Sequence, residues 1–211
     1  MTLAGLTGLS CAGKNYAASL LEAKGIPVLD VDKLGHHALE NQKNEVAAVF
    51  GTHILIPSED TDASAAVVDR RALGRLVFAN PAALARLEAI IHPEVDKLIN
   101  QWLADISNKQ QPSMCFINAA LLHKTAIAKQ LNFILVVTAP LLVRIVRAKK
   151  RDKLTLREIL RRFANQHNFI PSTFFPNAGI IHIPNNGLGI FPAAERRQLE
   201  ERLEAVLAYK E

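Results

Sequence analysis

The amino-acid sequence predicts an α/β fold in which a doubly wound parallel sheet is flanked by helices. Short apolar runs that suit buried strands alternate along the chain with longer stretches of helical periodicity. The runs at 113–117 and 133–137 are continuously apolar, which is typical of parallel strands covered on both faces. A glycine-rich turn joins the first apolar run, 3–7, to a helix-compatible run at 16–21. This order of strand, loop and helix is the context that a phosphate-binding loop requires.

The glycine-rich turn carries the most specific motif of the chain. Residues 8–15 read GLSCAGKN, so the P-loop pattern G-x-x-x-x-G-K is complete, and Asn15 stands where Ser or Thr is usual. In such a loop, backbone N–H groups and the N-terminal end of the next helix surround phosphate oxygens. Lys14 adds a point charge for the β- and γ-phosphates, and the Asn15 amide oxygen could ligate Mg²⁺ directly or through water. The motif predicts a sheet of the P-loop NTPase type; the alternative is a glycine-rich turn in an ordinary α/β unit. The predicted nucleotide contacts in the loop are Gly8, Ser10, Cys11, Ala12, Gly13, Lys14, Asn15 and Tyr16.

Length and composition narrow the class of protein. A chain of 211 residues suits one domain with an insertion, and its 49% hydrophobic and 21% charged residues are an ordinary balance. No apolar run has membrane-spanning length, and no signal peptide is expected. The two cysteines suit a reduced, cytoplasmic protein. The net charge of +5 suits an anionic ligand, but the basic residues are not interleaved with aromatic ones, so no nucleic-acid partner is predicted.

The stretch from about residue 50 to 108 predicts a mostly helical insertion between two sheet strands. Asn80 and Pro81 form a helix start signal, and His92 with Pro93 predicts the start of a further helix. The elements expected up to this point are a strand at 25–30, an apolar piece at 53–58, a surface loop at 59–66, and helices at 32–42, 69–79, 80–91 and from 92. A helical block of this kind suits substrate binding.

The sheet pattern returns after the insertion, and two basic helices follow it. The expected elements are strands at 113–117, 133–137 and 180–183 and helices at 140–150, 156–166 and 193–209. Arg147, Arg151 and Arg162 in the basic helices are candidates for clamping phosphate, because a guanidinium fork binds phosphate through two hydrogen bonds. For any one arginine, the alternative is a solvated helix face.

Two acids, Asp30 and Asp32, come at the carboxyl end of the second predicted strand. In an open α/β sheet this edge faces the ligand crevice. If the strand continued, a spacing of two residues would place both side chains on one face. A carboxylate there can orient a hydroxyl and accept its proton, whereas the alternative is that one acid caps the following helix.

Motifs along nearly the whole chain resemble the dephospho-coenzyme A kinase family. The matching segments are 5–8 with 13–14, 25–32 with its D-x-D ending, 69–73 (DRRAL), 77–78, 87–88, 92–93 (HP), 120–122, the arginines between 147 and 162 with Gln166, and 185–187. The D-x-D, D-R-R-x-L and H-P motifs in this order are much more selective than a P-loop alone. The resemblance implies that ATP, with Mg²⁺, phosphorylates the ribose 3′-hydroxyl of dephospho-CoA to give coenzyme A.

The resemblance also implies roles for individual residues. Asp32 becomes the base, with Lys14 and Arg147 as the other catalytic residues, and Asp30 could also orient metal-bound water. Arg151 and Asn186 join the P-loop as nucleotide contacts, and the acceptor contacts are Asp30, His36, Arg70, His92 and Arg162. The implied parts are a nucleotide-binding core (1–48, 112–142 and 167–211), a helical CoA-binding insertion (49–111) and a lid (143–166).

Several positions depart from the family pattern. Asn15 replaces Ser or Thr and Asn118 stands where an Asp is common, and both are the candidate metal ligands. Ala120, Lys124 and Gly179 are further departures. The sequence therefore leaves turnover, metal preference, nucleotide selectivity and oligomeric state open. The alternatives are another nucleoside or nucleotide kinase, and a weakly catalytic nucleotide- or CoA-binding protein.

Overall fold

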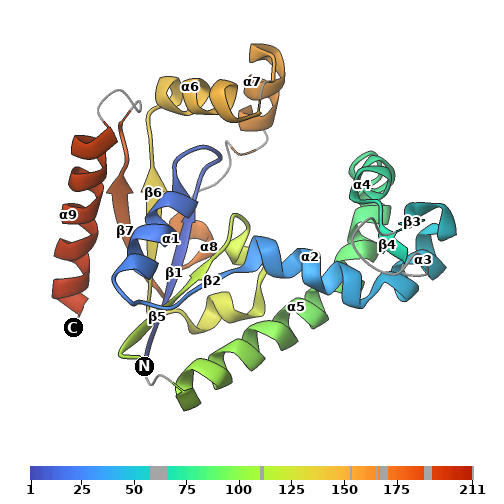
Figure 1. Ribbon diagram of the computed structural model, residues 1–211, viewed down its shortest axis with the longest axis horizontal. Coiled ribbons are helices and arrows are strands. Elements are labelled where there is room, and N and C mark those ends of the chain that lie inside the picture. Colours follow the sequence, from blue (N-terminus) through green and yellow to red (C-terminus); the bar gives the residue numbers. More distant parts are fainter. Residues whose placement is uncertain are drawn as a thin grey trace. The chain divides into compact units, whose positions relative to one another are not determined.

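A computed structural model describes residues 1–57, 66–109, 112–152, 154–164, 166, 171–187 and 192–210 (Figure 1). The chain divides into two compact units, which we call the core unit (residues 1–30 and 104–211) and the inserted unit (residues 31–103). The surface loop predicted at 59–66 lies outside the described residues except for Ala66. The boundaries of a CoA-binding insertion at 49–111 stay a prediction.

The described part of the core unit contains a five-stranded sheet in the order β2-β5-β1-β6-β7, with every neighbouring pair parallel. Its strands are β1 (Thr2–Gly8), β2 (Val28–Asp30), β5 (Met114–Asn118), β6 (Phe133–Thr138) and β7 (Gly179–Pro184). All of β5 and all but the last residue of β6 are buried, as their continuous apolar runs predict. The predicted parallel sheet flanked by helices is thus confirmed.

Helices cover the sheet of the core unit, and α9 lies beside β7 (Figure 1). The helices are α1 (Lys14–Ala23), α6 (Leu141–Asp152), α7 (Leu156–Ala164), α8 (Pro171–Phe174), α9 (Pro192–Lys210) and the 3₁₀ turns η2 (Leu122–Lys124) and η3 (Ala126–Gln130). Leu21 of α1 and Leu199 of α9 are buried in one cluster with Leu6, Phe116 and Phe133 of the strands. Burial of each such side chain stabilises the fold by about 1.5–3 kcal/mol, so the cluster holds α1 and α9 against the sheet.

The inserted unit has its own small core. Its elements are α2 (Val31–Asn41), α3 (Lys43–Phe50), η1 (Thr52–Ile54), the antiparallel pair β3 (Leu55–Pro57) and β4 (Ala66–Val68), α4 (Arg70–Phe78) and most of α5 (Pro81–Lys109). Leu39, Val46 and Leu73 are buried together in this core. The Asp69 carboxylate caps α4 by accepting from Arg71 N at 2.9 Å and Ala72 N at 3.0 Å.

The prediction that a new helix begins at His92 and Pro93 is wrong, because α5 continues through both residues. Pro93 cannot donate to the carbonyl one turn earlier, so the helix lacks one internal hydrogen bond there. Buried side chains just after the proline hold the next turn in place. Val95 is 7% exposed, and the Glu94 carboxylate accepts hydrogen bonds from Asn41 at 2.9 Å and Lys97 at 3.2 Å. Among the described residues, no helix combines the length and apolar character needed to cross a membrane.

Candidate active site

The P-loop leaves β1 at Gly8 and enters α1 at Lys14. Gly13 caps the helix with a φ of 103°, and Cys11 has a φ of 62°, so two of the loop residues are in the left-handed region. A Cβ at Gly8 would overlap the carbonyl oxygen of Val137 on β6. Glycine at these positions lets the loop turn tightly against the sheet, as a phosphate cradle requires.

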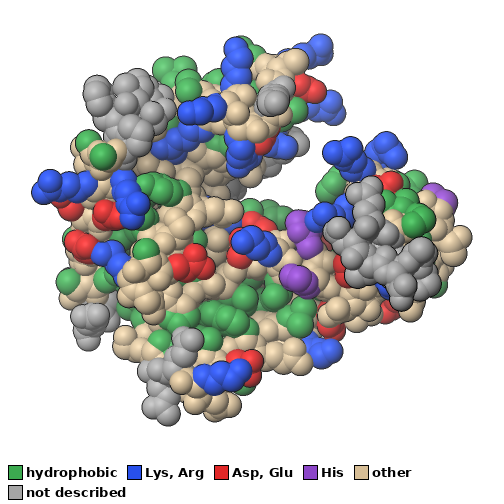
Figure 2. All heavy atoms as spheres, in the orientation of Figure 1, with side chains coloured by type: hydrophobic (Ala, Val, Ile, Leu, Met, Phe, Trp, Pro, Cys, Tyr) green, Lys and Arg blue, Asp and Glu red, His purple; other side chains and the backbone are tan. Residues whose placement is uncertain are grey.

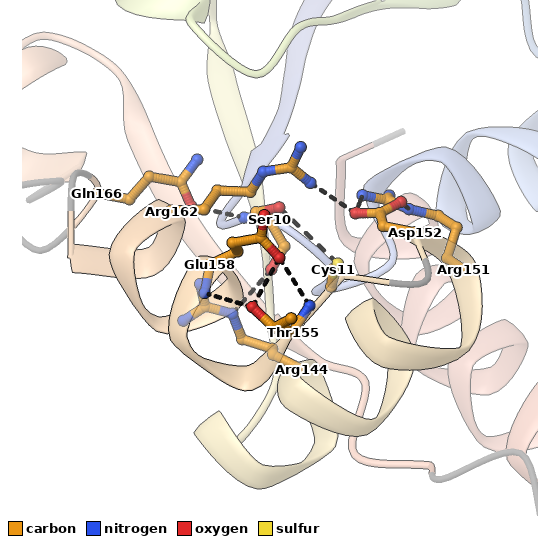
Figure 3. A network of polar contacts seen from close by, with 9 residues as sticks. All are labelled: Ser10, Cys11, Arg144, Arg151, Asp152, Thr155, Glu158, Arg162 and Gln166. Atoms are coloured by element: carbon orange, nitrogen blue, oxygen red, sulfur yellow. Dashed lines mark hydrogen bonds and ion pairs between the residues drawn. The ribbon is translucent and has the colours of Figure 1, made fainter.

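Three side chains from later in the chain bind the backbone of the P-loop. Arg144 Nε donates to the Ser10 carbonyl at 2.8 Å, and Gln166 Oε1 accepts from the Ser10 N–H at 2.9 Å (Figure 3). The side-chain amide of Asn185, at the end of β7, donates to the Ala12 carbonyl at 2.8 Å. The loop is therefore held by one residue of α6, one residue after α7 and the residue that follows β7.

Arg144 is 7% exposed and lies over Phe163, with its guanidinium carbon 4.2 Å from the ring centroid. Burial lowers the pKa of the Arg144 guanidinium from its ordinary value. Because a guanidinium is not deprotonated in proteins, the group still carries its charge near neutral pH. A cation is thus buried beside the P-loop and packed on an aromatic face.

Arg147 also contacts the P-loop, on its Cys11 and Ala12 side. Its Nη1 donates to the Cys11 carbonyl at 3.3 Å and to the Ala12 carbonyl at 2.9 Å. Its Nη2 donates to Asn185 O and Oδ1, both at 3.1 Å, and to the Gly187 carbonyl at 2.6 Å. These bonds direct both Nη groups at protein oxygens.

Arg151 and Arg162, the other predicted phosphate clamps, meet at one carboxylate. Asp152 accepts from Arg151 Nε at 2.6 Å and Nη2 at 2.9 Å, and from Arg162 Nη1 at 2.5 Å (Figure 3). The hydrogen bond from Arg151 holds the pKa of Asp152 below its ordinary value. Lysine and arginine side chains gather over α6 and α7 (Figure 2), so this part of the core unit is electropositive.

The start of α7 has a capping box formed by Thr155 and Glu158. Glu158 Oε2 accepts from the Thr155 N–H at 2.8 Å and from its hydroxyl at 2.6 Å, and Thr155 Oγ1 accepts from the Glu158 N–H at 3.4 Å (Figure 3). The first turn of α7 is thereby fixed locally, with Arg162 two turns further along.

The candidate metal ligands come together at the carboxyl ends of β2 and β5. Asp30 and Asn118 are paired in the register of these strands, and Asn118 Nδ2 donates to Asn15 Oδ1 at 3.4 Å. Asn118 is 1% exposed, and its Oδ1 has no hydrogen-bond partner among the described residues. A buried, orphaned amide oxygen fits a role toward Mg²⁺ or a water that Mg²⁺ binds. The described residues contain no group of three acidic, His or Cys side chains that could hold a metal without the nucleotide.

The predicted strand end at residue 30 and the helix predicted from residue 32 are confirmed, because β2 ends at Asp30 and α2 begins at Val31, so the two acids do not share one face of a continuing strand. Asp32 is exposed in the first turn of α2, where a carboxylate interacts favourably with the positive end of the helix. Asp32 is therefore the first acid of the inserted unit, two residues after the last residue of β2.

The other predicted site residues lie at various places in the two units. His36 and Arg70 are exposed on α2 and α4, and His92 is half-buried within α5; all three belong to the inserted unit. In the core unit, Tyr16 is exposed on α1. Asn186 is exposed next to Asn185, whose side chain binds the P-loop. Their predicted roles stay predictions.

Sequence reasoning missed Arg144 and Asn185 as parts of the site. Only Arg144 had a signal in the sequence. Arg144 lies three residues before Arg147, a spacing that places both side chains on one face of a helix. Asn185 directly follows β7, and its neighbour Asn186 is the residue that the sequence analysis predicts as a nucleotide contact.

A parallel sheet whose central strand leads into a complete G-x-x-x-x-G-K loop, with arginine-bearing helices around that loop, defines a P-loop kinase. Comparison with known proteins is more specific. The profile of the dephospho-CoA kinase family matches residues 2–169. The chain belongs to the dephospho-CoA kinase family.

Individual relatives agree with this family. The chain is 32% identical over 188 residues to a dephospho-CoA kinase of Treponema denticola, with 87% of this chain and 82% of that protein covered. It is 36% identical over 169 residues to one of Geobacter metallireducens, with 79% and 80% covered. The crystal structure of TT1252 from Thermus thermophilus superposes with a TM-score of 0.75 at 33% identity, covering 99% of this chain and 97% of that one.

Proposed function

We propose that this chain transfers the γ-phosphoryl group of ATP to the ribose 3′-hydroxyl of dephospho-CoA, giving ADP and coenzyme A. The observation that carries this proposal is the complete P-loop on the central strand of a chain that matches the dephospho-CoA kinase family over residues 2–169. The free thiols of Cys11 and Cys115 suit a reducing compartment, and we place the protein in the cytoplasm.

In the proposed reaction the P-loop holds the ATP phosphates. Backbone N–H groups of the loop and the Lys14 ammonium stabilise the negative charge that develops as the phosphoryl group moves. The Asp32 carboxylate orients the 3′-hydroxyl and takes its proton while the hydroxyl oxygen bonds to the γ-phosphorus. The bond from that phosphorus to the bridging oxygen breaks, and ADP leaves.

Mg²⁺ neutralises charge on the β- and γ-phosphates when it is bound with ATP. Asn15 and Asn118 would hold it or its waters, because their amide oxygens are neutral donors at the carboxyl edge of the sheet. Asp30 lies next to Asn118 in register and could orient such a water or the acceptor. Two neutral amides supply less attraction for a hard cation than a carboxylate and a hydroxyl do, so we propose that the metal arrives with the nucleotide.

The remaining contacts divide between the two substrates. We assign Arg151 and Asn186 to the nucleotide, and Arg162 to the acceptor side of the lid. His36, Arg70 and His92 of the inserted unit are assigned to dephospho-CoA, with Arg70 for its phosphates. Arginine suits that task because its planar fork makes two parallel bonds to a phosphate.

Product analysis tests the proposal directly. The protein is incubated with Mg-ATP and dephospho-CoA, and the products are identified by mass spectrometry and by the position of the new phosphate. Coenzyme A with the phosphate on the 3′-oxygen is the expected product. Turnover of AMP or adenosine in preference to dephospho-CoA would indicate another nucleotide kinase. Tight binding of both substrates with no product would indicate a binding protein.

A further inference from the structure

The outer side of the P-loop presents carbonyl oxygens that need hydrogen-bond donors. When a loop turns its N–H groups inward toward phosphate, its carbonyls point outward and must be satisfied by other groups. Two of these carbonyls, on Cys11 and Ala12, receive donors from Arg147 and Asn185. Cys11 also has a φ of 62°, in the left-handed region that a non-glycine residue adopts only at an energetic cost. The loop therefore needs external bonds to hold this shape.

Arg147 and Asn185 form one hydrogen-bonded pair. The Arg147 Nη2 donates to both oxygens of Asn185, and Asn185 in turn donates its side-chain N–H to Ala12 O. Asn185 is 7% exposed, and a Cβ at Gly13 would overlap its amide nitrogen. The absence of a side chain at Gly13 is thus what lets Asn185 reach the loop.

The guanidinium of Arg147 has little capacity left for a ligand. A guanidinium has five N–H donors, of which four are on its two Nη atoms. Five protein oxygens accept from these two atoms, on Cys11, Ala12, Asn185 and Gly187. Burial lowers the pKa of Arg147, and the Glu195 carboxylate opposes that shift. The group is placed as a bridge inside the protein.

We infer that Arg147 and Asn185 are positioning residues that hold the P-loop in its phosphate-binding shape before ATP arrives. This inference rests on the proposed function only in taking ATP as the ligand of the loop. It changes the role that the sequence indicates for Arg147: the residue acts through the carbonyls of Cys11 and Ala12. Of the core-unit cations predicted to contact phosphate, Lys14, Arg151 and Arg162 keep that assignment.

The two thiols of the chain allow a test without nucleotide. Cys11 is half-exposed in the loop, whereas Cys115 is buried in β5 and its pKa is raised to about 11 by burial. The alkylation rate of Cys11 therefore reports on the loop, and that of Cys115 reports on unfolding of the sheet. Both rates are measured by mass spectrometry of the full-length protein with iodoacetamide.

Arg147→Lys keeps the positive charge but loses the fork that bridges the loop to Asn185 and Gly187. Without nucleotide, we expect Cys11 to be alkylated faster, on the order of tenfold, with Cys115 unchanged. The Kd for ATP should rise by a similar factor, because the binding-competent loop is less populated. Asn185→Ala should give the same two changes. The matched control is Arg197→Lys, on the exposed face of α9, where neither quantity should change.

The competing role, direct contact of Arg147 with phosphate, predicts a different pattern. The Cys11 rate without nucleotide would then be unchanged in both variants, and Asn185→Ala would bind ATP normally; that result overturns the inference. If Arg147→Lys also speeds the alkylation of Cys115, that variant has unfolded. The Cys11 and Cys115 alkylation rates of Asn185→Ala then decide between the two roles. Failure of the proposed reaction would leave these measurements valid, since neither requires turnover.

Discussion

The side-chain amide of Asn118 donates a 3.4 Å hydrogen bond to the amide oxygen of Asn15, so two neutral groups pair at the proposed metal site. The pair joins the end of β5 to the first turn of α1. We expect an active enzyme with a raised Mg²⁺ requirement, because neutral oxygens attract this cation less than a carboxylate does.

Asn118→Asp should lower the Mg²⁺ concentration that gives half-maximal rate at fixed ATP. The new carboxylate needs a hydrogen-bond donor at position 15, and Asn15→Thr supplies a hydroxyl there. The double variant should therefore lower the Mg²⁺ requirement more than either single change does. The measurement is a Mg²⁺ titration of the kinase rate for the parent, both single variants and the double variant. Superimposable titration curves would show that Asn118 does not act on the metal.

Lys14→Ala should slow turnover by roughly a hundredfold or more, since it removes a charge that stabilises the transferred phosphoryl group. Lys14 is the first residue of α1 and Ala has a high helix propensity, so the melting temperature should hardly change. The rate at saturating substrates and the thermal unfolding curve are measured together. Near-normal turnover would rule out the role of this loop in catalysis.

Asp32→Asn preserves the size of the side chain and removes the base. Turnover should fall by ~10²–10⁴ while the Kd for ATP is retained. Asp30→Asn is the matched comparison, because it changes the neighbouring acid at the end of β2. If Asp30→Asn abolishes turnover and Asp32→Asn does not, the two assignments must be exchanged.

Asp152→Asn should loosen Arg151 and Arg162, which share this carboxylate, and weaken ATP binding several-fold. The stability effect has a defined pH dependence. Because the pKa of Asp152 is lowered by folding, its contribution is present above about pH 4 and is lost as pH falls through the lowered value. The arginines are solvent-accessible, so the contribution is about 0.5 kcal/mol.

The measurement for Asp152 is the melting temperature of the parent and of Asp152→Asn at pH 7 and at pH 3. The difference between the two proteins should shrink at the lower pH, since the parent carboxylate is then increasingly protonated. Glu200→Gln serves as control for a surface ion pair on α9 that does not involve the lid helices. An equal difference at both pH values would mean that the ionised carboxylate is not the stabilising species.

The sequence was sufficient where local pattern determines structure. The apolar runs of β5 and β6 predicted buried parallel strands, and the glycines of residues 8–13 predicted the loop. It failed where distant contacts override local signals. Pro93 is a strong helix-start signal after His92, yet packing of Val95 and bonding of Glu94 keep α5 continuous.

The same reason explains the missed site residues. Nothing near Asn185 in the sequence distinguishes it from Asn186, because the difference is made by the bare backbone of Gly13 more than a hundred and seventy residues earlier. Which of two similar neighbours faces a site depends on tertiary contacts that no local pattern encodes.

The bond from the Asn185 side chain to the Ala12 carbonyl spans a sequence separation of 173 residues, and the bond that the Ser10 N–H donates to Gln166 Oε1 spans 156. During synthesis, the ribosome releases the loop long before the residues that fix its shape. A nascent chain therefore has the motif but not its supports until β7 has emerged and joined the sheet. We expect tight capture of ATP to appear late in translation, as a signal that the last strand has docked.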